Sequence, residues 1–151
     1  MFNLQNLNPG ERFYWGDTED LPEAQREWVE FRLVSSREID VARKAAGIKQ
    51  KVEYRQNKRG VPHRLEYVDT SEEKMMALVD SINDMSIVTW HLLDHTGKEI
   101  ACTTANKTLM VRGSSAFNEW MADCLEEVKE HQTLRKEQQG KNSLPTLSDS
   151  E

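Results

Sequence analysis

The sequence predicts an α+β fold, namely a small antiparallel sheet of hairpins packed by two short helices and a longer C-terminal amphipathic helix. Three observations favour this class. Segments that alternate with strand periodicity are interspersed with helical segments, turn residues separate strand pairs at hairpin spacing, and a long apolar stripe of helical period lies near the C-terminus. The length of 151 residues fits one domain. We expect that domain over 13–130, between a flexible leader at 1–12 and a fraying helix end with a disordered polar tail at 131–151.

Two strands and a short helix are expected in the N-terminal part of the domain. Aromatic residues predict a short edge strand at 13–15. Apolar and charged residues then alternate over 28–34, which predicts a half-buried strand. Ser35 and Glu38 have the spacing of a capping box, so a helix over 36–46 should begin there.

Two hairpins and a second short helix follow. Segments 48–56 and 61–68 alternate around the turn sequence NKRG, which predicts a β-hairpin. Thr70 and Glu73 predict a capped helix over 71–83, whose helical apolar positions are Met75, Met76, Val79 and Ile82. The run SIVTWHLLD, the turn HTGK and the run EIACT predict a central hairpin whose first strand, 86–93, is buried on both faces.

The strongest periodic signal in the chain predicts a helix over 115–130. A helical turn at 104–112 precedes it, and Gly113 with the two following serines marks a new start. We expect its apolar stripe to pack in the core, with a homo-oligomer face as its other possible use; the stripe contains Phe117, Trp120, Met121, Leu125 and Val128.

Catalytic, cofactor and metal sites have no recognisable motif in this sequence. His91, His95 and Cys102 do not have the spacing of a common zinc site. Cys124 lies on the apolar stripe without a sequence signal for an adjacent base. P-loop, dinucleotide-binding and hydrolase signatures do not occur. We therefore expect a non-enzymatic protein with no cofactor and no metal ion.

The sequence also bears on cellular location. Its first residues lack the pattern of a signal peptide, and its longest apolar run, MMALV at 75–79, is too short to cross a bilayer. Two cysteines suit the reducing environment of a cytoplasm. We expect a cytoplasmic protein that has no membrane partner.

Charge is distributed unevenly along the chain. The net charge is −6, yet residues 43–64 contain eight basic side chains and one acidic one. The strongest candidates for partner binding in or beside this segment are Lys49, Lys51, Arg55, Lys58, Arg59 and Arg64. Either they keep an exposed hairpin soluble or they dock an acidic helix or tail. The negative remainder of the chain would repel phosphate, which disfavours nucleic acid as a partner.

Four segments resemble, in order and spacing, the tail assembly chaperones of long-tailed bacteriophages. These segments cover about half of the chain; they are WVEFRLVSSREID at 28–40, SIVTWHLLDHTGKEIACT at 86–103, TTANKTLM at 103–110 and FNEWMADCLEEVKE at 117–130. The aromatic leader and the basic hairpin at 49–64 depart from the family's pattern. The resemblance therefore assigns no partner contact to the hairpin.

This resemblance implies a non-enzymatic protein that works in the cytoplasm of an infected host cell. Such a protein would keep the hydrophobic, helical tape measure protein soluble and recruit tail tube subunits. Family members often occur in two lengths through a programmed ribosomal frameshift, and Gly140 with Lys141 is a dipeptide that a slippery run can encode. The alternative is a small phage or bacterial adaptor or regulatory module whose basic hairpin binds nucleic acid or an acidic partner. A steep dependence of affinity on salt would separate nucleic-acid binding from apolar helix binding.

Overall fold

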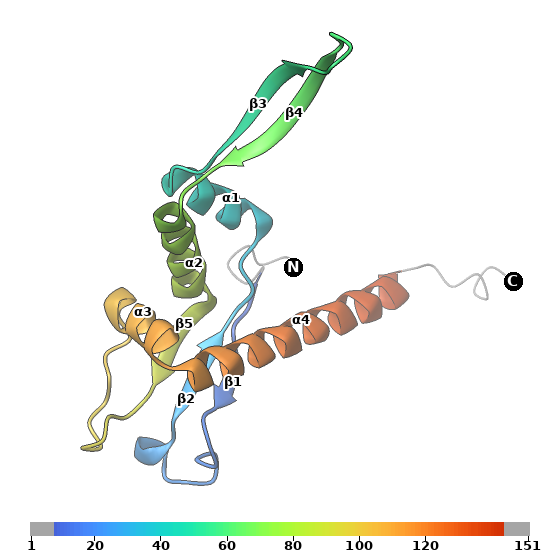
Figure 1. The fold of residues 1–151 in the computed structure, drawn as a ribbon. Helices are drawn as coiled ribbons and strands as arrows, with labels where there is room; N and C mark the ends of the chain where they lie inside the picture. Colours follow the sequence, from blue (N-terminus) through green and yellow to red (C-terminus); the bar gives the residue numbers. More distant parts are fainter. Residues whose placement is uncertain (1–7, 144–151) are drawn as a thin grey trace, which may run out of the picture. The chain divides into compact units, whose positions relative to one another are not determined.

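The computed structural model describes residues 8–143, which divide into two compact units. Within them lie four α-helices and two small antiparallel sheets, which confirms the α+β class (Figure 1). Unit 1 contains residues 8–33 and 86–143, and unit 2 contains Val34–Met85. The range 13–130, expected as a single domain, is therefore interrupted by unit 2, which packs around a small core of its own.

A three-stranded antiparallel sheet lies at the centre of unit 1. Its strands are in the order β1-β2-β5 and have the bounds β1 Glu11–Tyr14, β2 Trp28–Phe31 and β5 Ile87–His91 (Figure 1). Phe13 lies opposite Val29, which in turn lies opposite Trp90. Opposed residues share a sheet face, so this row places apolar side chains on the side that carries the core.

Two of the predicted strands have bounds that differ from those expected. β2 ends at Phe31 instead of 34, because the ladder to β5 shifts register between Glu30 and Phe31 and the next backbone amide, that of Arg32, bonds to the carbonyl of Ser86. β1 begins at Glu11, inside the range expected to be a leader, and residues 1–7 lie outside the described residues.

The predicted central hairpin is wrong in its second strand. After β5, Leu93 and Glu99 form a single bridge, and EIACT forms no strand. The indole of Trp90 donates a hydrogen bond to the carbonyl of Ile100 at 2.8 Å, so this segment is held as a loop beside β5. β5 is also not buried on both faces, because Trp90 is buried whereas Thr89, which lies on the opposite face, is exposed.

Two helices complete unit 1. The turn expected at 104–112 is the helix α3, Thr104–Gly113, and α4 spans Ser115–Ser143 (Figure 1). The hydroxyl of Ser114 accepts from the amide of Phe117 at 3.1 Å, which caps α4 where the sequence predicted a new start. α4 continues past residue 130, where fraying was expected, and the tail at 144–151 lies outside the described residues.

A side-chain contact accounts for part of this extension. Glu11 of β1 accepts a hydrogen bond from His131 at 2.8 Å and lies 3.6 Å from the guanidinium of Arg135. His131 and Arg135 are one helical turn apart on α4. The helix is thus joined to the sheet beyond Val128, the last residue of its apolar stripe.

Unit 2 consists of a long hairpin and two short helices. Its elements are α1 Ser36–Ala45, β3 Lys49–Gln56, β4 Pro62–Asp69 and α2 Glu72–Ser86, the last of which ends in unit 1 (Figure 1). The capping box of Ser35 and Glu38 is confirmed, and Gly47 ends the turn after α1 with a φ of 78°. The cap of α2 differs from the prediction, because the hydroxyl of Ser71, not Thr70, accepts from the amide of Lys74.

The core of unit 2 is small. Its buried members are Ala42, Ile48 and Leu78, and Ile82 and Met85 pack against them. α2 therefore buries the side that carries Leu78, Ile82 and Met85, whereas Met75, Met76 and Val79, three of the four apolar positions named from the sequence, are exposed.

Candidate functional site

The β3–β4 hairpin contains the basic residues that the sequence singles out, and its register sorts its side chains onto two faces. Opposed pairs run from Lys49 with Asp69 to Gln56 with Pro62. Alternate pairs share a face. We name these the charged face, with Lys49, Lys51, Glu53, Arg55, His63, Leu65, Tyr67 and Asp69, and the apolar face, with Gln50, Val52, Tyr54, Gln56, Pro62, Arg64, Glu66 and Val68.

The six candidate binding residues do not form one patch. Lys49, Lys51 and Arg55 lie on the charged face, as the alternation predicts. Arg64 lies on the apolar face, directly opposite Tyr54. Lys58 and Arg59 lie in neither strand but in the turn that joins them.

Acidic neighbours on the hairpin neutralise three of these six residues. Lys51 is 2.9 Å from Asp69, Arg55 is 3.1 Å from Glu53, and Arg64 is 2.8 Å from Glu66; these distances join a side-chain nitrogen to a carboxylate oxygen. The hydrogen bond and charge of Asp69 raise the pKa of Lys51, and those of Lys51 lower the pKa of Asp69. The pairs are exposed, so each contributes little to stability. Their main effect is to cancel charge.

The turn retains its positive charge. Its backbone is held by Asn57, whose side-chain oxygen accepts from the amides of Arg59 at 2.9 Å and Val61 at 3.0 Å. Gly60 has a φ of 76°, which suits glycine. Lys58 and Arg59 have no ion-pair partner within residues 8–143. This basic turn, 57–60, presents a formal charge of +2 at the end of the hairpin.

The apolar face is exposed for most of its length. Tyr54 is 70% exposed, Val68 56% and Val52 45%. Val52 and Tyr54 alternate with Lys51 and Arg55 along β3, so they lie on the face opposite these basic residues. Val68 belongs to the same face through its pairing with Gln50, a contact that only the strand register determines.

α2 presents a second exposed apolar cluster in unit 2, which consists of Met75, Met76 and Val79. Methionine side chains are flexible and polarisable, and surfaces that accommodate different partners use them often. The sequence carries a signal for this cluster. Apolar positions from Met75 to Met85 cover about half of the helix circumference, more than the stripe of about 100° that one core contact uses.

Exposed apolar side chains are concentrated in unit 2. Nine of the large ones lie there: Val41, Val52, Tyr54, Val61, Tyr67, Val68, Met75, Met76 and Val79. Four lie in the larger unit 1: Leu21, Val88, Leu109 and Leu134. Unit 2 is therefore the candidate protein-binding part of the described chain.

The stripe of α4, by contrast, lies in the core of unit 1. Phe117, Met121 and Val128 are buried, and Trp120 and Leu125 are partly buried against the same core. Trp120 contacts the ring of Trp15 edge-on with a centroid distance of 4.9 Å and that of Phe31 at 5.4 Å. This side of α4 is therefore occupied by the protein's own sheet and its flanking aromatic residues.

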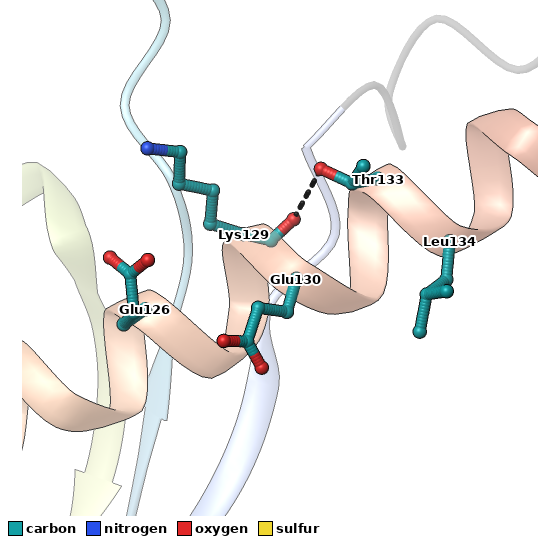
Figure 2. Close-up of a pocket in the computed structure, with 5 residues that line it drawn as sticks. All are labelled: Glu126, Lys129, Glu130, Thr133 and Leu134. Atoms are coloured by element: carbon teal, nitrogen blue, oxygen red, sulfur yellow. Dashed lines mark hydrogen bonds between the residues drawn. The ribbon is translucent and has the colours of Figure 1, made fainter.

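A groove of about 440 Å³ runs along the exposed side of α4. Its described lining residues all come from this one helix: Glu126, Lys129, Glu130, Thr133 and Leu134 (Figure 2). Figure 2 shows them along successive turns, with the hydroxyl of Thr133 donating to the carbonyl of Lys129 at 3.0 Å. Side chains from a single helix do not surround a small ligand, whose sites are usually concave.

Unit 1 also contains a cavity of about 110 Å³ between the sheet and its helices. Trp15, Leu92, Ile100 and Phe117 are among its lining residues, and its one ionisable group is Glu27. The Glu27 carboxylate accepts from the amide of Leu93 at 3.0 Å. Ligand pockets for drug-sized molecules are usually about 300 Å³ or larger, so this cavity suits at most a very small molecule.

Cys124 and His91 are held in structural contacts. Burial raises the pKa of the Cys124 thiol to about 12, with Glu127 and Asp123 adding to the shift, so the thiolate does not form at neutral pH. His91 donates from Nδ1 to the carbonyl of Arg26 and stacks on Trp28. Residues 8–138 contain no group of three or more His, Cys, Asp or Glu side chains that could hold a metal ion.

Comparison with known proteins identifies no relative. No family model, curated protein or solved structure matches this chain. In the part of the chain that the structure describes, no helix has both the length and the apolar composition that crossing a bilayer requires.

Proposed function

We propose that the protein is a non-enzymatic tail assembly chaperone that binds an aggregation-prone helical protein, the phage tape measure protein, and keeps it soluble. The observation that carries the proposal is the exposed apolar surface of unit 2. Nine large apolar side chains are exposed on a unit whose core buries only Ala42, Ile48 and Leu78. Exposed apolar side chains that cluster on one face, as Met75, Met76 and Val79 do on α2, are typical of protein interaction sites.

The chemistry of this surface fits an amphipathic helix. Such a helix exposes an apolar stripe that would otherwise self-associate, and Val52, Tyr54, Met75 and Met76 offer apolar area to cover it. The remaining surface is strongly charged, and the net charge of −6 keeps a complex soluble once the stripe is covered. Recruitment of tail tube subunits in the host cytoplasm belongs to the same proposal and is supported by the resemblance alone.

Co-expression tests this function. The full chain is produced with the tape measure protein encoded beside its gene, and the soluble fraction and the complex on a sizing column are measured. We expect the chain to raise the soluble fraction of the tape measure protein and to elute with it. Equal solubility with and without the chain, and no shared peak, would show that the proposed function is wrong.

A pair of variants locates the surface. Replacing Met75, Met76 and Val79 by serine removes exposed apolar area from unit 2 and should reduce the soluble complex severalfold. Replacing Leu109 and Leu134 by serine removes exposed apolar area from unit 1 and serves as the matched control. Equal losses in the two variants would contradict the assignment to unit 2.

One observation favours the alternative, a small adaptor or regulatory module that binds nucleic acid. Lys58 and Arg59 are without ion pairs within the described residues, and the exposed Tyr54, on whose ring a base could stack, is three residues before the basic turn in the chain. Phosphate contacts would make the affinity fall steeply with salt. Tight binding of a single-stranded oligonucleotide with that salt dependence would favour this alternative.

A further inference from the structure

We propose that the apolar face of the β3–β4 hairpin binds an amphipathic α-helix whose acidic residues lie at the end that passes the basic turn. This inference rests on the proposed function, because it assigns a site and a segment chemistry to the same partner. Its first support is the composition of the face. Tyr54, Val52 and Val68 are exposed there, at 70%, 45% and 56%.

The apolar face has no net charge, and this distinguishes it from the rest of the hairpin. Its single cation, Arg64, is paired with Glu66 at 2.8 Å. The charged face has three basic and two acidic side chains, whereas the basic turn has two basic side chains and no acidic one. An apolar stripe can therefore lie along the face without burying an unpaired charge, a burial that would be costly.

The dimensions of the hairpin set the length of the helix. Each strand has eight residues, Lys49–Gln56 and Pro62–Asp69. At about 3.4 Å per residue this is roughly 27 Å, which is the length of an α-helix of about 18 residues. A partner helix of five turns would thus cover the face from its base to the turn.

The basic turn gives the bound helix a direction. Lys58 and Arg59 project from a loop whose backbone is fixed by the bonds to Asn57, so their charge stays at one end of the hairpin. Acidic residues of the partner, or the negative end of its helix dipole, would be attracted there. Such charge complementarity sets orientation and association rate more than affinity.

A helix on the face fits better than an added strand or a second copy of this chain. Lysine and proline discourage strand addition at a sheet edge; β3 carries Lys49 and Lys51, and β4 begins with Pro62. The hairpin from Lys49 to Asp69 has six basic and three acidic side chains, so two hairpins packed face to face would repel each other.

The test uses the full chain and a labelled synthetic peptide. The peptide has 18 residues, leucines at i, i+3, i+4 and i+7 spacing, and glutamates in one terminal turn; a scrambled peptide of the same composition is its control. Affinity is measured by fluorescence anisotropy. Tyr54→Ser should weaken binding about tenfold or more, because truncating a central interface aromatic commonly has an effect of that size.

Tyr67→Ser is the matched control, because Tyr67 is also exposed, at 45%, but on the charged face. It should leave affinity within about twofold, as is usual for residues outside the interaction surface. Lys58→Glu with Arg59→Glu should slow association several-fold at low salt, an effect that high salt removes. Far-UV circular dichroism of each variant verifies the hairpin.

The results separate this inference from the proposed function. Equal effects of Tyr54→Ser and Tyr67→Ser, equal binding of the scrambled peptide, or no peptide binding would overturn the inference. So would Tyr54-dependent self-association, which points to a second copy, or tight oligonucleotide binding at this face, which points to nucleic acid. If Tyr54→Ser abolishes peptide binding but the tape measure protein stays insoluble, the proposed function fails and the helix site stands. If the chain solubilises that protein and Tyr54→Ser has no effect on peptide binding, the proposed function stands and the helix site on the hairpin is wrong.

Discussion

Unit 1 and unit 2 use their apolar residues in opposite ways. Unit 1 buries nine hydrophobic residues in one cluster, in which Val29 and Phe31 are fully enclosed, and Val128 is buried in addition to these nine. Unit 2 buries three and leaves nine large ones exposed. Stability grows with the apolar area removed from water, so unit 1 carries most of the chain's stability. The apolar residues of unit 2 remain available for a partner.

The two units also differ in where their aromatic residues lie. All four tryptophans, at positions 15, 28, 90 and 120, belong to unit 1, whereas unit 2 has two tyrosines and no tryptophan. Tryptophan fluorescence therefore reports the unfolding of unit 1, and hydrogen exchange of the backbone amides of β3 and β4, measured by NMR, reports unit 2. This separation makes the comparison directly measurable.

The largest expected effect is that of Phe117→Ala in the core of unit 1. Phe117 is buried and contacts the rings of Trp15, Phe31, Trp90 and Trp120. Its truncation removes a large side chain and leaves a cavity, so the free energy of unfolding should fall by about 3–5 kcal/mol. Urea unfolding followed by tryptophan fluorescence measures this change.

Leu78→Ala is the matched substitution in unit 2. Leu78 is buried in the small core there, and its truncation should speed exchange of the β3 and β4 amides while the tryptophan transition moves little. If Leu78→Ala shifts the tryptophan transition as far as Phe117→Ala does, the two units unfold together and the comparison fails.

A smaller effect is expected from ion pairs in the two units. Glu11 of unit 1 is 22% exposed and bonds to His131, so Glu11→Gln should destabilise unit 1 by about 1 kcal/mol. Glu66 of unit 2 is 51% exposed, and Glu66→Gln should produce no measurable change. Urea titrations of both variants give the comparison. If Glu66→Gln lowers the free energy of unfolding more than Glu11→Gln does, the hairpin depends on its ion pairs.

The smallest expected effect concerns two carboxyl groups. Lys51 lowers the pKa of Asp69 in unit 2, whereas hydrogen bonds from Thr96 and from the amide of Lys98 lower the pKa of Asp94 in unit 1. A lowered pKa stabilises the fold fully above the ordinary value of 3.8, and this contribution is lost as the pH falls through the lower, folded value. NMR titration measures both groups.

Salt should change the pKa values of Asp69 and Asp94 to different extents. The shift of Asp69 includes a charge attraction at the surface, so 1 M salt should move its pKa back toward the ordinary value. The shift of Asp94 comes from hydrogen bonds and should persist. Equal responses to salt would contradict the assignment of different causes.

Local features of the fold could be predicted from the sequence. The Ser35–Glu38 capping box, the hairpin around 57–60 and the start of α4 all depend on residues within one or two turns of each other. These features do not depend on tertiary contacts, and for that reason the sequence alone predicts them. Side chains alternate between the two faces of a strand, so the sequence also predicts that the lysines of β3 lie on one face and Val52 and Tyr54 on the other.

The sequence by itself therefore determined the class of fold, most helices and strands, and which residues of β3 share a face. Only the tertiary structure decided which side of α2 is buried, that EIACT forms no strand, that α4 continues beyond Val128, and that acidic partners neutralise Lys51, Arg55 and Arg64. Several of these outcomes depend on residues far apart in the chain, as with Glu11 and His131. Sequence periodicity predicts which residues share an apolar face, but tertiary packing determines which other element of the fold covers that face.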